Sequence, residues 1–517
     1  MKKMIAVLLS MLMVCCFVSA RGSQPGQTSS GTVVPGKTWN GIDVSQPQVI
    51  KMYLLGDIPN DLNTVWTEIN KKIGEKINAT VELSFLSWAE HAQKYSLLFS
   101  GGEDFDLIFT ASSWAHYETT AAMGGFHALD DNFISKYAPG IKAVVPQAAW
   151  DQAKINGRIY MIPQYQNEFN GDIYAIRGDL MRKYGYSDLT TLPQVIEFFT
   201  KVAADQAATG ISPRGNISSG MLYEYFQVDG YTVLGGSISE LFLYHTQDAS
   251  DVKPMYLLDW PKFEQYCNDM KRFYELGFWS KDSLASADQR QDGLLRGTSA
   301  SMSWNLGSCL TYAVQANTTH PDWDVNLIDY NALPKTVASY INNGVAINAA
   351  SRKKERAMMA LDLLYTDKEI HDMAVYGIPG VHWEPVGDKE YTRLPRSSDF
   401  GSYCTWGWNN MTLTREEYVP NPMPVQIKAE ELEATWNRNI KPAHPLDSIS
   451  IDKSGITSEV AMVESIIAQY YTPLLSGMAG DVPQAIAALK QQLTLAGIDK
   501  IIRVFNEQAA AHVAASR

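Results

Sequence analysis

Between residues 49 and 123, short apolar runs alternate with segments of helical periodicity, and this order constrains the fold more than any other feature. The apolar runs at 49–55, 80–86 and 105–109 predict strands. Apolar residues recur at helical spacing over 62–77 and 89–99, which predicts helices. Strands that alternate with helices form a parallel sheet covered by helices, so the sequence predicts an α/β fold.

A second block of the same style runs to about residue 337. Its composition predicts helices over 192–204 and 260–276, and a strand over 300–304. A strand at 345–347 returns to the style of the first block. The C-terminal segment 457–512 has helical periodicity and is predicted to be a helical extension.

Composition excludes several classes of protein. The 517 residues suggest two to four domains, and 45% hydrophobic residues can bury a large core. The formal charge is −13, which argues against binding to nucleic acid because such a protein needs a basic surface. A neutral ligand remains compatible with this charge, and the 13 Trp and 26 Tyr residues supply rings that could contact one.

The N-terminus predicts export. Lys2 and Lys3 precede an apolar stretch that is too short to span a bilayer, so residues 1–20 are predicted to be a signal peptide. Two processing routes stay open: cleavage after Ala20, or lipidation of Cys16 in a stretch that resembles a bacterial lipobox. The segment 21–48 is rich in Gly, Ser and Thr and is predicted to be a flexible tether. The chain is expected at the outer face of the cell membrane or in the periplasm, with a lipid anchor as its only membrane contact.

No catalytic or metal-binding motif is found. The sequence contains no GxSxG, HExxH, GxxxxGK[ST] or GxGxxG pattern, and its nine histidines have no ligand spacing. Cys267, Cys309 and Cys404 are widely separated, and they are expected to be buried thiols or to include one disulfide. We therefore expect no metal, no cofactor and no enzymatic activity, although acidic residues are too many for a glycosidase pair to be excluded by counting.

Three stretches carry a family resemblance: 105–109, 155–163 with Trp150 ahead of it, and 300–304. In these stretches the chain resembles family 1 of the extracellular solute-binding proteins, the maltose-binding-protein type that serves ABC importers. The stretches 376–383, 481–486 and 496–502 are similar to the LipO-type lipoprotein branch of that family. The resemblance covers about residues 49–512.

The resemblance implies a two-lobed periplasmic-binding-protein type II fold, with parallel-rich sheets flanked by helices and a ligand cleft between the lobes. Chain order then assigns 49–163 and 338–395 to lobe one. It assigns 164–337 and 396–517 to lobe two, which would include the helical C-terminal segment.

Candidate ligand contacts are aromatic, hydroxyl and amide side chains at the predicted strand ends and crossover. A sugar offers an apolar ring face and hydroxyl groups, so its site needs aromatic rings and planar hydrogen-bonding groups. In open α/β sheets, ligands bind beyond the carboxyl ends of the strands. The candidates are Asp57, Trp88, Ser112, Ser113, Trp114, Tyr165, Gln166, Asn167, Glu224, Tyr225, Trp304, Asn305, Asn342, Trp383 and Trp406.

The resemblance implies a monomeric receptor that captures a sugar or oligosaccharide by domain closure and delivers it to the permease subunits of an ABC importer. No bond is made or broken in such a process. Two other functions stay open: an exported carbohydrate-active enzyme, and a binder of a non-sugar ligand such as a peptide or polyamine. A polyamine site would need several carboxylates, whereas the candidate loops are mainly aromatic and amide.

Overall fold

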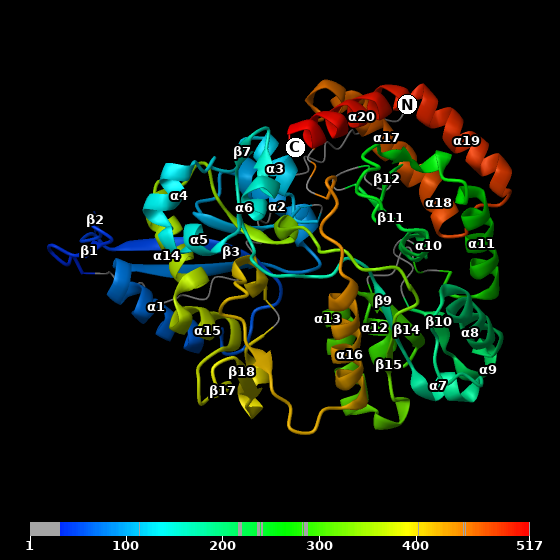
Figure 1. Ribbon diagram of the computed structural model, residues 1–517, viewed down its shortest axis with the longest axis horizontal. Helices are drawn as coiled ribbons and strands as arrows, with labels where there is room; N and C mark the ends of the chain where they lie inside the picture. Colours follow the sequence, from blue (N-terminus) through cyan, green and yellow to red (C-terminus); the bar gives the residue numbers. More distant parts are fainter. Residues whose placement is uncertain are drawn as a thin grey trace, which may run out of the picture.

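The computed structural model describes residues 32–515, except 113, 216–219, 235–237, 239–240, 282, 284–287, 402, 448 and 450. Two lobes lie side by side, and each is built around a mixed β-sheet flanked by helices (Figure 1). The predicted α/β class and two-lobed architecture are confirmed. Among the described residues, no helix is both long and apolar enough to cross a bilayer.

The first lobe contains a five-stranded sheet in the order β4-β3-β5-β16-β8. Strands β3 (Gln48–Leu55), β4 (Ala79–Leu86) and β5 (Leu107–Thr110) are parallel, as the alternating pattern predicts. Strands β16 (Gly344–Ile347) and β8 (Ile162–Pro163) add antiparallel pairs. The sheet is therefore mixed although mostly parallel, because β16 returns from the other lobe in the opposite direction.

Helices cover the first-lobe sheet with their apolar faces. Helix α1 (Leu62–Ile77) buries the residues that its spacing predicts, Trp66 among them. Asp61 stands at its N-cap, but its carboxylate bonds to Arg396 and to Nε2 of His382 at 3.0 Å instead of capping the helix. The other covering helices are α2 (His91–Ser100), α3 (Tyr117–Ala122), α14 (Lys354–Thr366) and α15 (Lys368–Tyr376).

The second lobe contains a four-stranded sheet in the order β10-β14-β9-β15. Only β10 (Ser212–Arg214) and β14 (Ser299–Trp304) are parallel. Strands β9 (Ile173–Ile176) and β15 (Asn326–Ile328) pair antiparallel, so this sheet is also mixed. As a consequence, the end of β14 lies beside the start of β9, with Trp304 opposite Ile173.

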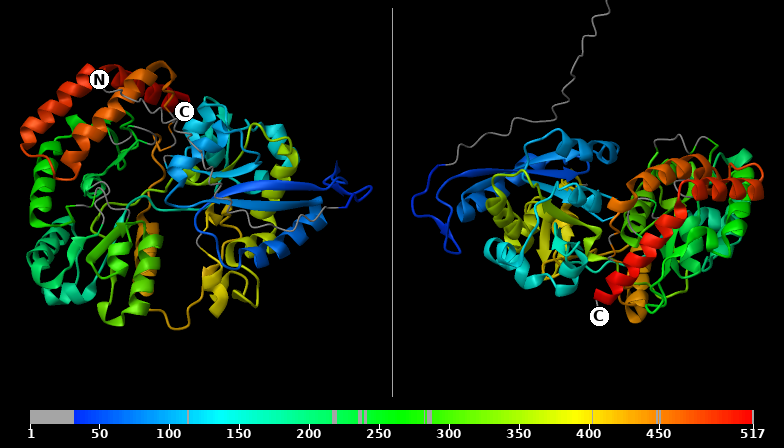
Figure 2. Two further views of the ribbon diagram at one scale, coloured as in Figure 1. Left: turned by 180° about the vertical axis from the view of Figure 1, so that it is seen from behind. Right: turned by 90° about the horizontal axis from the view of Figure 1, so that it is seen from above.

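The C-terminal helices belong to the second lobe. They run across one end of the second lobe, from α19 on its outer side to the end of α20 on the side that faces the first lobe (Figure 2). They share one hydrophobic core with α11 (Phe263–Leu276) and β12 (Phe242–His245). Their order is α17 (Thr457–Ile466), α18 (Thr472–Leu475), α19 (Val482–Leu495) and α20 (Ile498–Ala515).

Extended segments connect the lobes. One follows β8, and Phe169 in it pairs antiparallel with Val337 of the segment that returns to β16. Thr336 also pairs with Lys441, beyond α16 (Pro424–Asn439). The predicted boundary at residue 395 stays a prediction; the first-lobe core continues beyond it through Phe400, Tyr403, Cys404 and Trp408.

Part of the predicted tether is folded. Residues 32–48 include β1 (Thr38–Trp39) and β2 (Ile42–Asp43), and Val44 is fully buried. Lys37 Nζ donates to the Gly74 carbonyl of α1 at 2.8 Å, which fixes this segment on the first lobe. Residues 1–31, and with them the predicted signal peptide and Cys16, lie outside the described residues. Cys267, Cys309 and Cys404 are free and buried, and each lies in a different core.

Candidate ligand-binding site

Three tryptophans meet at the carboxyl edge of the first-lobe sheet. Trp88 follows β4, Trp114 follows β5, and Trp406 lies in a 3-10 turn at Thr405–Trp408. The Trp88 and Trp406 rings are parallel within 4°, with centroids 6.0 Å apart, and Trp114 lies 6.4 Å from Trp88. All three are half-buried. We call Trp88, Trp114 and Trp406 the indole cluster; it unites three residues that the sequence singled out separately.

Hydrogen bonds hold the loop that carries Trp114. Its Nε1 donates to the Asn342 carbonyl at 3.1 Å, and the Ser112 hydroxyl donates to Glu118 of α3. Asn342 in turn donates from its side chain to Glu168 at 3.3 Å. Ser112 and Asn342 therefore support the indole cluster. Ser113 lies outside the described residues.

Two histidines stand behind the indole cluster. The His91 ring contacts Trp88 and Trp114 edge-on at 6.0 and 5.9 Å, and His116 stacks on Tyr95 at 4.9 Å. His91 Nδ1 and His116 Nε2 are buried and have no hydrogen-bond partner among the described residues. Burial lowers the pKa of both, and the neighbouring His116 lowers the pKa of His91 further. Both rings are therefore neutral at neutral pH, and His91 supports the cluster through its contacts with Trp88 and Trp114.

The crossover residues lie between the two lobes' sheets. Tyr165 is fixed by its backbone, whose N–H donates to the Asn409 carbonyl at 2.8 Å, and its ring lies 6.3 Å from Tyr340. Gln166 accepts a hydrogen bond from the Asn409 side chain, whereas Asn167 is exposed. Tyr165 and Gln166 are thus ordered parts of the connection, seven residues before the second-lobe sheet begins at β9.

On the second lobe, one tryptophan is combined with two charges. Trp304 ends β14, and Asp172 immediately precedes β9, so the antiparallel pairing brings them together. The Arg290 guanidinium lies 5.0 Å above the Trp304 ring and 3.7 Å from the Asp172 carboxylate. Burial raises the pKa of Asp172 to about 6, while Arg290 opposes the shift. The arrangement offers a ring, a carboxylate and a guanidinium at one edge.

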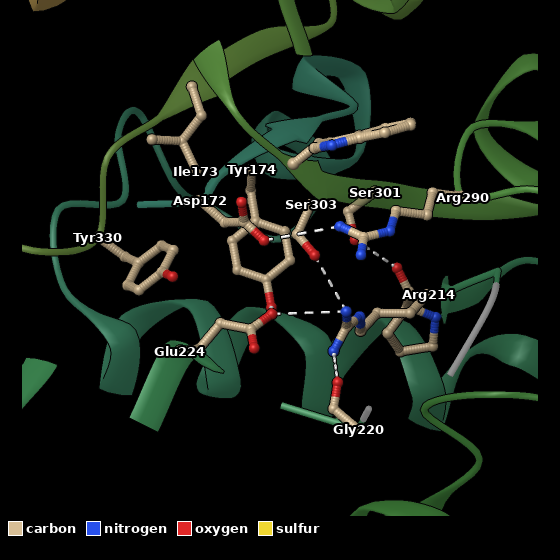
Figure 3. Close-up of polar contacts among 12 residues, drawn as sticks. Asp172, Ile173, Tyr174, Arg214, Gly220, Glu224, Arg290, Ser301, Ser303 and Tyr330 are labelled. Atoms are coloured by element: carbon tan, nitrogen blue, oxygen red, sulfur yellow. Dashed lines mark hydrogen bonds and ion pairs between the residues drawn. The ribbon is translucent and has the colours of Figure 1, made fainter. Parts of the chain in front are cut away.

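A buried polar network lies beneath this edge (Figure 3). Arg214 at the end of β10 donates to the Ser303 hydroxyl at 3.0 Å and to the Gly220 carbonyl, and lies 3.4 Å from Glu224. The Tyr174 hydroxyl donates to the same carboxylate at 2.7 Å. Arg214 and Glu224 are almost completely buried, so each neutralises a charge that would be costly alone.

Several predicted contacts have other roles. Glu224 and Tyr225 lie in helix α10 (Leu222–Val228) rather than in a loop. Glu224 joins the buried network, and the Tyr225 hydroxyl donates to Asp269 at 2.9 Å. Asn305 caps α13 (Leu306–Thr319), accepting from the Ser308 N–H at 2.9 Å.

Trp383 and Asp57 lie in different environments. Trp383 begins β17 (Trp383–Val386), is 3% exposed, and donates its indole N–H to Gly377, so the structure places it in a core. Asp57 is exposed at the end of β3. Because β3 lies between the parallel strands β4 and β5, Asp57 lies at the same edge of the sheet as the indole cluster.

Sequence reasoning found Glu224 but missed the other charged residues of the second-lobe edge and network, Arg214, Asp172 and Arg290. Arg214 is the last residue of a strand and Asp172 directly precedes one, so strand-end position could have identified both. No sequence pattern marks Arg290 as a site residue, because its place beside Trp304 arises only from tertiary packing. Within the described ranges, no three His, Cys, Asp or Glu side chains gather where they could hold a metal ion.

Comparison with known proteins identifies the family. Residues 63–370 match the model described as "Bacterial extracellular solute-binding protein", which covers more than half of the chain. The chain belongs to the bacterial extracellular solute-binding proteins. Residues 447–514 match a second model, described as a domain of unknown function, DUF3502. Membership of an extracellular family implies export.

Relatives of this solute-binding protein include one from Streptococcus pneumoniae serotype 4 (strain ATCC BAA-334 / TIGR4), a "Carbohydrate ABC transporter substrate-binding protein". It is 26% identical over 485 residues, with 92% of each chain covered. The N-glycan transport solute binding protein of S. pneumoniae has a similar fold: TM-score 0.70, 20% identity, with 91% of this chain and 100% of that chain covered. An extracellular solute-binding protein from Bifidobacterium longum subsp. infantis gives a TM-score of 0.60 at 13% identity, covering 90% and 99%.

Proposed function

We propose that this solute-binding protein is the receptor of an ABC importer and captures a neutral oligosaccharide between its lobes. One observation carries the proposal: an indole cluster on the first lobe and a Trp304–Arg290–Asp172 group on the second lie at the sheet edges next to the crossing segments. Sugars need this combination, because their ring faces pack on indoles while their hydroxyls bond to carboxylate and guanidinium groups.

The charge of the second-lobe group favours a neutral ligand. Arg290 and Asp172 are 3.7 Å apart, so the guanidinium already has a carboxylate partner. Neighbouring hydroxyls of a sugar can accept from Arg290 and donate to Asp172 without adding net charge. A peptide or a polyamine would add charge that this pair does not balance.

The relatives support a carbohydrate ligand. The S. pneumoniae relative is named as a carbohydrate transporter component. The structurally similar N-glycan transport protein has been solved in complex with Man1GlcNAc and with Man5GlcNAc. These ligands are neutral oligosaccharides, the class that the two tryptophan groups suit.

Binding works by domain closure in this proposal. A ligand that touches both lobes stabilises the closed state by its differential contacts. The closed form then docks on a membrane permease and releases the ligand unchanged, as a monomer with no catalytic residue. Candidate contacts are Trp88, Trp114, Trp406 and Trp304, with Asp57, Tyr165 and Asn167 nearby. A lipid on Cys16 would keep the receptor at the membrane surface.

A binding screen tests the proposal. Isothermal titration calorimetry with Man5GlcNAc, maltooligosaccharides, a neutral peptide and spermidine should give heat only with a saccharide, and binding should raise the unfolding temperature. Chromatography of the saccharide after incubation should show it intact. Binding of the peptide or spermidine alone would contradict the sugar assignment, and cleaved saccharide would favour the carbohydrate-active enzyme.

A further inference from the structure

The C-terminal helical unit, which runs from α17 to α20 over residues 457–515, is built into the second lobe. The Phe505 ring of α20 stacks on Phe242 of β12 with centroids 4.1 Å apart. The Trp279 Nε1 donates to the Ser476 carbonyl at 3.2 Å. Residues from α17 to α20 belong to the same hydrophobic core as β12 and α11. This unit therefore moves with the second lobe as one body.

The turn after α18 packs against the segment that holds Arg214. Gly220 has a φ of +64°, and a β-carbon there would lie 2.5 Å from the Leu475 carbonyl oxygen. The Gly220 carbonyl accepts a hydrogen bond from Arg214 (Figure 3). Only glycine combines this backbone conformation with so close an approach. The position of α18 thus limits where the Gly220 carbonyl stands.

Arg214 extends this contact to the candidate ligand edge. Its other amino group donates to the Ser303 hydroxyl at 3.0 Å, and Ser303 is the neighbour of Trp304 in β14. The chain of contacts runs from Leu475 through Gly220, Arg214 and Ser303 to the strand end that carries Trp304. Each link is almost completely buried, so it has little freedom to adjust.

A second glycine fixes the turn on α11. Gly477 has a φ of +73°, and a β-carbon there would overlap the Met270 carbonyl oxygen. Lys271 of the same helix donates from Nζ to the Gly480 carbonyl at 2.5 Å. The turn after α18 is therefore held between α11 and Gly220.

We propose that the C-terminal helical unit positions the second-lobe ligand contacts, with Leu475, Gly220 and Arg214 as the positioning residues. The inference rests on the proposed function only in taking Trp304 and Arg290 as ligand contacts. It gives the domain of unknown function a role: it sets the orientation of Trp304 without touching the ligand.

Fluorine NMR of the full chain labelled with 5-fluorotryptophan tests this role. Trp304→Phe assigns the Trp304 resonance. Gly220→Ala and Gly477→Ala should shift that resonance and leave the Trp88 resonance of the first lobe unchanged. The matched control is Gly210→Ala, which imposes similar strain at a φ of +69° but has no atom within 4 Å of the added carbon; it should leave Trp304 unchanged.

An unchanged Trp304 resonance in both glycine variants would overturn the proposal. If the glycine variants do not fold, Arg214→Lys keeps a positive charge beside Glu224 but loses the fork that joins Gly220 and Ser303, and it should shift Trp304. The measurement needs no ligand. A shifted resonance in a protein that binds no saccharide would therefore support this inference and reject the proposed function. An unshifted resonance in a protein that binds a saccharide would reject this inference and support the proposed function.

Discussion

The two lobes build their candidate ligand contacts in opposite ways. The first lobe brings together three half-buried indoles, supported by neutral histidines and backbone carbonyls. The second lobe places a single tryptophan under Arg290 and above a buried network of Arg214, Glu224 and Tyr174. The first arrangement offers apolar ring faces, whereas the second offers directed hydrogen bonds.

This difference has a physical consequence for stability and specificity. Indoles at loop ends contact one another through dispersion, which tolerates small displacements. A buried guanidinium and carboxylate depend on each other, because removal of one leaves an unpaired charge in the interior. Substitutions in the indole cluster of the first lobe should therefore mainly reduce ligand affinity. Substitutions in the buried network of the second lobe should mainly reduce the stability of the protein. Four predictions test this contrast.

The largest effect is expected for Arg214→Met. It leaves the Glu224 carboxylate buried without its cation and should cost about 3–5 kcal/mol of unfolding free energy in urea denaturation. Lys500→Met is the control, because that lysine pairs with Glu459 at 2.7 Å on the surface and its loss should cost below about 1 kcal/mol. Equal losses in both variants would show that the buried second-lobe pair contributes no more to stability than a surface pair.

Trp88→Ala and Trp406→Ala should weaken saccharide binding, because each removes one face of the stacked pair. We expect a loss of about 1 kcal/mol per ring, or roughly five-fold in affinity by calorimetry. Trp383→Phe should lower the unfolding temperature but leave affinity unchanged, since its indole is buried and bonded to Gly377. If only Trp383→Phe weakened saccharide binding, the ligand site would lie away from the indole cluster.

Acidification should affect the two lobes with opposite sign. The folded-state pKa of Asp172 is raised from 3.8 to about 6, so its contribution to stability is present at low pH and lost as pH rises through about 6. His91 and His116 have lowered pKa values, so their contribution is lost as pH falls below the ordinary value of 6.5.

Unfolding temperatures measured against pH in matched variants test these signs. On acidification from neutral pH, the wild type should gain stability relative to Asp172→Asn and lose stability relative to His91→Gln. The effect should be smaller than that of Arg214→Met, because Asp172 and both histidines are only half-buried. Slopes of the same sign would contradict the pKa shifts of Asp172 and His91, in which burial favours the neutral form of each group.

The smallest effect is expected for Asn305→Ala. The side chain caps α13, so its loss should cost about 1 kcal/mol of stability and leave saccharide affinity unchanged. Asn305→Asp keeps the acceptor and should restore stability. A loss of affinity without loss of stability would make Asn305 a ligand contact, as the sequence first suggested.

Sequence periodicity was sufficient to locate most elements. Helix α1 buries Trp66 on the face that its helical spacing predicts. The strand ends were also found, and with them Trp88, Trp114 and Trp304. The mixed pairing of the sheets was not predicted, because the direction of a strand depends on the connections between the lobes.

Local sequence determined where strands and helices form, since hydrophobic spacing and caps act over a few residues. Tertiary structure decided which strand ends meet, and therefore that Trp88 stacks on Trp406 while Trp383 enters a core. It also decided that Gly220, whose carbonyl accepts from Arg214, packs against Leu475 of the C-terminal helices. The Trp88–Trp406 and Gly220–Leu475 contacts join residues more than 200 positions apart, and packing rather than periodicity selects them.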